Sequence, residues 1–293
     1  MLFKFEPIFK EKIWGGHKLS SIYHYPCSTQ TGEAWGISAH QNGSSIIKNG
    51  PFKGLTLRQL YHEQRQFFGD LSNDEFPILV KLIDASDDLS IQVHPDDAYA
   101  REHENSLGKT ECWYILNADP NTEIIIGHKA KTKAEFIHHF NNKQVESILN
   151  RFPIKSHDQF NIYAGTIHAI CKGTLLLEIQ QSSDITYRLY DYQRLSNGKL
   201  RELHINKALD VIKFPDNKLS NKQPSHLFHY EIVSNADTKN TVAHQFGDYL
   251  FIMEGKGEID QTPIEKGDFL MISSSSRYQL QGSFQYAKIQ IHN

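Results

Sequence analysis

The 293-residue sequence lacks any apolar run near the roughly 20 residues that a membrane-spanning helix needs. Its first residues, MLFKFEPIFKEKIWGG, have neither a basic start followed by an apolar centre nor a small-residue cleavage site, so they do not resemble a secretory signal. Its three cysteines, Cys27, Cys112 and Cys171, are too few and too widely spaced for a disulfide framework or a CxxC zinc site. We therefore expect a cytoplasmic protein with reduced thiols and no membrane association.

Strong charge of either sign is also missing. The chain carries 31 Lys and Arg residues against 34 Asp and Glu residues, giving a formal net charge of -3, and no long block of like charges. Such a balance argues against electrostatic binding of nucleic acid. The length and the 39% hydrophobic content are those of a globular protein with a sizeable core. Oligomeric state is not indicated by any of these properties.

A regular alternation of strands and helices is absent as well, which argues against a doubly wound sheet. Short runs rich in β-branched and aromatic residues recur instead, bounded by Gly, Pro, Asn and Asp. They predict strands at 78–83, 89–94, 111–117, 122–126, 160–163, 167–171, 174–181 and 185–192. This pattern is typical of a mainly β sandwich or jelly-roll barrel.

Two helical segments interrupt the predicted strands. Thr56 is a candidate N-cap for a helix that extends to about Phe68. Thr132, with Glu135 three residues later, has the spacing of a capping box and predicts a helical insertion at about 132–152. We expect this insertion to cover one end of the β structure.

The polar segment 214–226, which contains two prolines, is the best candidate for a linker. It would separate a domain at 1–213 from a smaller β domain at 227–293. The segment ECWYILNA (111–118) resembles DYLFIMEG (248–255), and EGKGEID followed by EKGDFLMI predicts a hairpin and a returning strand. The second copy offers Arg277 and Tyr278 where the first offers a histidine, so we expect a metal site only in the first.

Three stretches of the first domain supply candidate metal ligands. In LSIQVHPDD (89–97) the strand period places Ile91 and Val93 on one face and Ser90, Gln92 and His94 on the other. Glu111 begins a predicted strand, and His168 follows a Gly-Thr turn. Two imidazoles, a carboxylate and an amide oxygen suit a borderline divalent ion, zinc first. Each residue alone is more often a structural hydrogen-bond or ion-pair partner than a ligand.

The segment 175–194, LLLEIQQSSDITYRLYDYQR, contains an arginine within an aromatic strand. A guanidinium flanked by tyrosines is typically stacked on their rings or held for an anion, so Arg188 is either a surface residue over the tyrosines or a substrate-binding group. Asp191 and Arg194 are expected to form a local ion pair. Glu178 alternates with apolar residues in the preceding strand.

Six stretches together resemble the short bacterial type I mannose-6-phosphate isomerases of the cupin superfamily: IWGG (13–16), GEAWGIS (32–38), residues 76–97, GKTECWYIL (108–116), GTIHAI (165–170) and residues 178–194. The resemblance covers most of residues 1–212 and is looser in the C-terminal quarter. It implies a zinc enzyme with one ion per chain that interconverts mannose 6-phosphate and fructose 6-phosphate. It also implies a cupin-type jelly roll with a second, smaller cupin-like domain that lacks the metal site.

Carried across motif by motif, the resemblance implies metal ligation by Gln92, His94, Glu111 and His168. It implies a catalytic role for Arg188 and a substrate-pocket role for Lys109. Aldose–ketose isomerisation through a cis-enediol needs a base as well, and an arginine is a poor one. Glu178 and Lys109 are both candidates for the base, and Ser90 and Lys109 are candidates for binding the phosphate group.

Other functions remain open at this point. A cupin dioxygenase would use three histidines and one glutamate around iron, and Gln92 argues against that ligand set. A cupin isomerase that acts on glucose 6-phosphate is a neighbouring possibility. A non-catalytic sugar-binding cupin would not need an arginine next to the metal, so Arg188 favours the enzyme.

Overall fold

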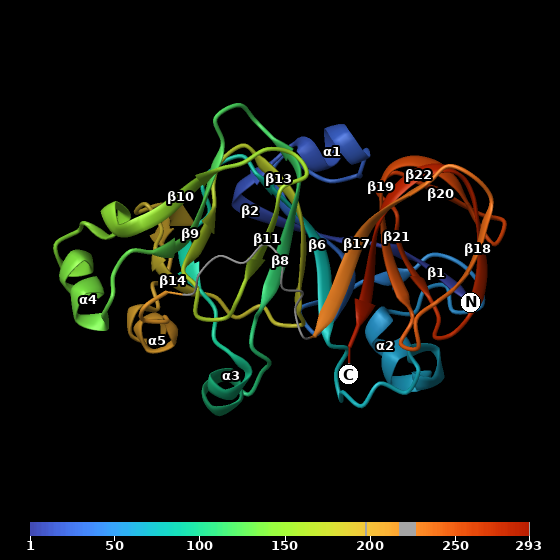
Figure 1. The fold of residues 1–293 in the computed structure, drawn as a ribbon, viewed down its shortest axis with the longest axis horizontal. Helices are drawn as coiled ribbons and strands as arrows, with labels where there is room; N and C mark the ends of the chain where they lie inside the picture. The colour runs from blue at the N-terminus through green and yellow to red at the C-terminus, as the bar shows by residue number, and fades with distance from the viewer. Residues whose placement is uncertain (197, 217–226, 293) are drawn as a thin grey trace.

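The computed structural model describes residues 1–196, 198–216 and 227–292. The described part is mainly β, with three larger sheets and one two-stranded ribbon formed by β15 (Leu195–Ser196) and β16 (Lys199–Leu200) (Figure 1). Among these residues, none of the helices combines the length and the apolar character needed to cross a bilayer. The mainly β prediction is confirmed.

The sheet that holds most of the C-terminal residues lies on the right in Figure 1, near both termini. We call it the C-terminal sheet. It consists of β17 (Phe228–Asn235), β22 (Arg277–Ile291), β19 (Asp248–Ile259), β21 (Phe269–Ile272), β1 (Leu2–Glu6) and β5 (Ile46–Ile47), with β18 (Lys239–Val242) and β20 (Thr262–Glu265) paired at its side. The hairpin predicted after residue 254 is confirmed as β19–β20.

A second sheet, the central sheet, lies beside it. Its strands are β11 (Gln159–Ile162), β8 (Glu111–Ala118), β13 (Thr174–Gln181), β6 (Ile78–Ala85), β2 (Ile8–Gly16), β3 (Thr31–His40) and β4 (Gly43–Ser44). The third sheet, the outer sheet, orders its strands as β10 (Leu149–Pro153), β9 (Glu123–His128), β12 (His168–Ile170), β7 (Ile91–Val93) and β14 (Tyr187–Tyr190).

The central sheet is buried on both faces, and period-two alternation divides its side chains between two cores. Cys112 of β8 belongs to a core shared with Phe5 and Phe269 of the C-terminal sheet. Its neighbour Trp113 belongs to a core shared with Ile126 of the outer sheet. Glu111 is therefore on the face that meets the outer sheet, opposite Cys112 as predicted.

The helices lie at the ends and edges of the sheets (Figure 1). They are α1 (Lys18–Tyr23), α2 (Leu57–Glu63), α3 (Asp97–Glu104), α4 (Lys133–Asn141) and α5 (Ile205–Val211), with 3-10 turns at η1 (Arg65–Phe68) and η2 (Val145–Ile148). Thr56 caps α2 through a capping box, and η1 continues to Phe68, so this prediction is confirmed.

The predicted helical insertion at 132–152 is only partly correct. Thr132 caps α4 through the backbone N–H of Glu135, but the Glu135 carboxylate accepts from Lys131 N rather than from the cap. The helix ends at Asn141, and 149–153 form strand β10, paired with β9. Residues 149–153 form backbone hydrogen bonds with β9, which is distant in the chain. These hydrogen bonds, rather than the local sequence pattern, determine that the segment is a strand.

The predicted division into 1–213, a linker at 214–226 and 227–293 stays a prediction. Residues 217–226 lie outside the described residues. Strands β1 and β5, from the first fifty residues, pair within the C-terminal sheet, with Leu2 opposite Ile272 and Phe5 opposite Ile47. The two ends of the chain therefore share one sheet.

Candidate functional site

Neighbouring strands of the outer sheet bring Gln92, His168 and Arg188 side by side. Gln92 of β7 pairs directly with His168 of β12 on one side and with Arg188 of β14 on the other. Directly paired residues point to the same face of a sheet. Ile91 and Val93, on the opposite face, are fully buried in an apolar core. The two faces predicted from the alternation in residues 89–94 are confirmed.

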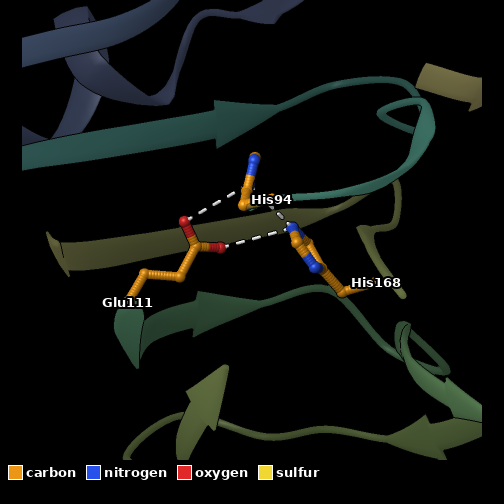
Figure 2. Close-up of side chains that lie close together, drawn as sticks. All are labelled: His94, Glu111 and His168. Carbon is orange, nitrogen blue, oxygen red and sulfur yellow. Dashed lines mark hydrogen bonds and ion pairs between the residues drawn. The ribbon is translucent and has the colours of Figure 1, made fainter. Parts of the chain in front are cut away.

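His94 and Glu111 complete a compact cluster with His168 (Figure 2). The Nε2 atoms of the two histidines are 3.1 Å apart. Glu111, from the facing central sheet, places Oε1 3.4 Å from His168 Nε2 and Oε2 3.6 Å from His94 Nε2. All three side chains are buried at about 1% exposure. In the described part of the chain this is the group of three ligand-type residues whose spacing could hold a metal ion.

The hydrogen bonds of the two rings fix which nitrogen carries the proton. His94 Nδ1 lies 2.7 Å from the carbonyl oxygen of Ile185, and His168 Nδ1 lies 2.9 Å from that of Thr166. A carbonyl only accepts, so each Nδ1 donates and each neutral ring presents the lone pair of Nε2 to the other. Two lone pairs at 3.1 Å repel unless a cation lies between them.

Burial keeps both rings neutral and therefore able to bind a metal. It lowers the pKa of His168 to about 4, and with Lys109 and His168 nearby it holds the pKa of His94 well below its ordinary value. Burial and the nearby Glu178 raise the pKa of Glu111 to about 7. The Glu111 carboxylate faces both Nε2 lone pairs, and its Oε2 also lies 3.3 Å from the Lys109 ammonium. Two imidazole nitrogens and a carboxylate converging in this way fit a divalent cation such as zinc.

Gln92 lies next to this cluster. Its Nε2 is 3.4 Å from His168 Nε2, and its Oε1 accepts from the Ser90 hydroxyl at 3.0 Å. Rotating the amide by half a turn exchanges nitrogen and oxygen without moving another group, and then presents the oxygen to the cluster. The hydroxyl of Ser90 can also accept, so it suits either orientation.

Lys109 lies between the cluster and a pocket. Its Nζ is 3.2 Å from His94 Nε2 and 3.3 Å from Glu111 Oε2. The pocket has a volume of about 500 Å³ and opens between the central and outer sheets. Ser90, Gln92, Lys109, Glu178 and Arg188, all singled out from the sequence, line it.

Arg188 is not stacked on a tyrosine ring in the described structure. Its Nη1 donates to the carbonyl of Glu202 at 3.2 Å, and its Nε is buried without a partner among the described residues. These contacts favour the interpretation as a substrate-binding group over that of a surface arginine stacked on tyrosines. The predicted ion pair between Asp191 and Arg194 is confirmed at 2.6 Å.

Sequence reasoning missed a buried charge network on the pocket wall. Lys81 Nζ lies 2.6 Å from Glu178 Oε2 and 3.9 Å from Glu33 Oε1. The indole N–H groups of Trp113 and Trp35 donate to Glu178 and Glu33, each at 2.9 Å. Burial opposes ionisation, but Lys81 and its neighbours hold the pKa of Glu178 below its usual value and that of Glu33 at about 2. The sequence did contain a signal of this network, because Lys81 is a charged residue within the apolar run ILVKLI.

Comparison with known proteins gives the same family repeatedly. Residues 2–126 match the model of the type I phosphomannose isomerase catalytic domain. A probable mannose-6-phosphate isomerase of Bacillus subtilis is 52% identical over 213 residues, covering 72% of this chain and 68% of that protein. A mannose-6-phosphate isomerase of Streptococcus mutans is 39% identical over an alignment of 310 residues that covers 96% of both chains.

Solved structures agree with these matches. The crystal structure of a mannose 6-phosphate isomerase from Bacillus subtilis superposes with a TM-score of 0.93 at 39% identity, covering 99% of each chain. A structure from Archaeoglobus fulgidus, described as a putative mannosephosphate isomerase, is 20% identical and has a TM-score of 0.83. This second likeness concerns the fold alone.

Proposed function

Because this chain belongs to the type I mannose-6-phosphate isomerases, we propose that it interconverts mannose 6-phosphate and fructose 6-phosphate with one zinc ion bound by Gln92, His94, Glu111 and His168. The observation that carries the zinc assignment is the pair of imidazole lone pairs 3.1 Å apart beside a buried carboxylate. When bound there, the ion supplies a Lewis acid that stabilises negative charge on sugar oxygens.

Arg188 is the residue proposed to hold the developing oxyanion of the cis-enediol. It lies beside Gln92 in the outer sheet and lines the pocket. Its buried Nε, which has no partner among the described residues, is a donor available to a substrate oxygen. An always-protonated guanidinium donates but does not accept, so it stabilises charge without acting as the base.

Glu178 is the better candidate for the base of the two residues considered. The reaction moves a proton from carbon 2 to carbon 1, while the hydroxyl proton on oxygen 2 passes to oxygen 1. Glu178 lines the pocket and is kept ionised by Lys81, so it can accept a proton. Lys109 lies 3.3 Å from Glu111 Oε2, and its remaining N–H groups can donate to a sugar oxygen.

The charges of the pocket support an anionic substrate. Its lining residues include six cations and four acids: Lys10, Lys12, Lys81, Lys109, Arg188 and Arg201 against Glu33, Glu178, Asp184 and Glu202. A sugar phosphate matches this excess of positive charge. We further propose that the enzyme works in the cytoplasm, where its three free thiols would persist.

A coupled assay on chelated and zinc-restored protein tests the proposal. We expect turnover of mannose 6-phosphate, its loss after chelation and its return with about one zinc per chain, with glucose 6-phosphate as the contrasting substrate. Folded, zinc-replete protein without turnover of mannose 6-phosphate would contradict the assignment. Preference for glucose 6-phosphate would move it to a different isomerase. Iron together with oxygen-dependent turnover would indicate a dioxygenase, and sugar-phosphate binding without turnover would indicate a binding protein.

A further inference from the structure

The six cations of the pocket differ in whether a carboxylate partner neutralises them. Four form ion pairs: Lys81 with Glu178 at 2.6 Å, Lys12 with Glu33 at 3.3 Å, Lys109 with Glu111 at 3.3 Å and Arg201 with Asp191 at 3.1 Å. Lys10 and Arg188 form no ion pair within the described part of the chain. Arg188 lies beside Gln92, at the metal end of the pocket. At the other end of the pocket, Lys10 is therefore the cation whose charge has no carboxylate partner among the described residues.

The ammonium group of Lys10 is held in a defined position. Its Nζ donates to the carbonyl of Asn42 at 2.7 Å and lies 5.1 Å from the centroid of the Trp35 ring. Gly43 leaves the room for this arrangement, because a Cβ there would lie 3.3 Å from both Lys10 Nζ and a ring carbon of Trp35. With one of three N–H groups on Asn42, two remain for a ligand.

A row of directly paired residues crosses the central sheet from the metal to Lys10. Trp35 pairs with Lys81, Lys81 with Glu178, and Glu178 with Trp113. The ring of Trp113 lies 5.5 Å from that of His168, and Trp35 carries Lys10 at the other end. Three strand spacings make this row about 14 Å long at the backbone. The side chains of this row therefore share one face of the central sheet, with His168 at one end and Lys10 at the other.

We propose that Lys10 binds the phosphate group of the substrate. The sugar carbons that react lie at Gln92 and Arg188, and the terminal phosphate reaches the ammonium group above Trp35. A phosphate oxygen accepts charge-assisted hydrogen bonds from its two free N–H groups. Asp184, at the same end of the pocket, is engaged by the Asn42 amide and lies 3.6 Å from His40 Nε2. This inference rests on the proposed function, because it names the residue that recognises the phosphorylated end.

Lys10→Met tests the proposal, because methionine keeps an unbranched chain over Trp35 and removes the charge. We expect KM for mannose 6-phosphate and the inhibition constant of inorganic phosphate to rise about 10- to 100-fold, the loss typical of a charge-assisted hydrogen bond. We expect kcat to stay within about twofold, because Lys10 lies far from the reacting carbons. Lys10→Arg should recover most of the affinity, and Lys53→Met, an exposed lysine outside the pocket, should change neither constant.

An unchanged KM, or a fall in kcat alone, would overturn the role of Lys10. So would unaltered inhibition by inorganic phosphate. Calorimetric titration of mannose 6-phosphate into both proteins separates this outcome from failure of the proposed function. If the wild type binds the sugar phosphate without turnover, the function fails, and the ratio of the two dissociation constants still decides whether Lys10 holds the phosphate. A wild type that neither binds nor converts it would overturn both.

Discussion

The two segments predicted from the sequence to be related both place an acid at the start of a buried strand. Glu111 begins β8 in ECWYILNA, and Asp248 begins β19 in DYLFIMEG. Both side chains are buried, at 1% and 0% exposure. Asp248 accepts from the Tyr278 hydroxyl at 2.9 Å and from the Gln290 amide at 2.7 Å. Its charge is therefore matched by donors from the protein itself.

Glu111 has different neighbours. The two histidines that face it present lone pairs, and the one cation paired with it in the described part of the chain is the Lys109 ammonium, 3.3 Å from Oε2. A buried acid surrounded by hydrogen-bond donors is a structural group, whereas a buried acid that faces two imidazole lone pairs is placed to share a metal ion with them. The comparison teaches that the position of an acid in the fold does not decide its role. Its role depends on whether the neighbouring groups donate hydrogen bonds to it or present lone pairs.

Matched substitutions of the two acids should give the largest contrast. We expect Glu111→Gln to lower zinc affinity and kcat/KM by more than about 100-fold, since even outer partners of metal ligands cost 10- to 100-fold. Asp248→Asn should keep both and lose about 1–3 kcal/mol of unfolding free energy, because it disturbs a buried hydrogen-bond network. Metal analysis, the coupled assay and urea unfolding measure these effects. Zinc content unchanged in Glu111→Gln would remove this residue from the ligands.

The two arginines offer an intermediate contrast. Arg188 lies in the pocket beside Gln92, whereas Arg277, in the second copy, is exposed at the start of β22. Arg188→Ala should keep zinc and lower kcat by about 100- to 1,000-fold, the size of effect seen when an oxyanion donor is removed. Arg277→Ala should change neither. Loss of zinc together with Arg188 would mean that the arginine supports the metal rather than the reaction.

Tyr278→Phe should give the smallest effect. It removes one of the donors to the buried Asp248 and should cost about 0.5–1.5 kcal/mol of unfolding free energy, because the Gln290 amide still donates to the carboxylate. Zinc content and kcat should equal those of the wild type if, as we expect, the metal site lies only in the first copy. Urea unfolding measures the change in unfolding free energy, and the coupled assay measures kcat. A fall in kcat without a loss of stability would contradict the division of roles between the halves.

Features carried by local patterns could be predicted from the sequence. Alternation in LSIQVHPDD placed Gln92 and His94 on one face, and the turn residues after 254 predicted the hairpin of β19 and β20. The capping residue Thr56 marked the beginning of α2. These signals depend on neighbours within a few residues, where strand and helix periods act directly.

Features that depend on residues far away in the sequence could not be predicted. Lys81 lies within a strand that reads as core, and its role became visible only when β6 was paired with β13, which places Glu178 opposite it. Strand β10 followed a segment that begins as a helix, and its pairing with β9 decided its structure. The free charge of Lys10 is likewise a property of the whole pocket, since it depends on which acids neutralise the other cations.

The pairing of Leu2 with Ile272 has a consequence for how the chain is made. On the ribosome, β1 emerges long before β21, so one of its two edges finds its partner only when β21 leaves the exit tunnel. Until then the nascent chain can pair β1 with β5 but cannot close the C-terminal sheet. Loops of this length are closed late and slowly. We therefore expect a nascent intermediate in which β1 exposes an unpaired edge until β21 has emerged.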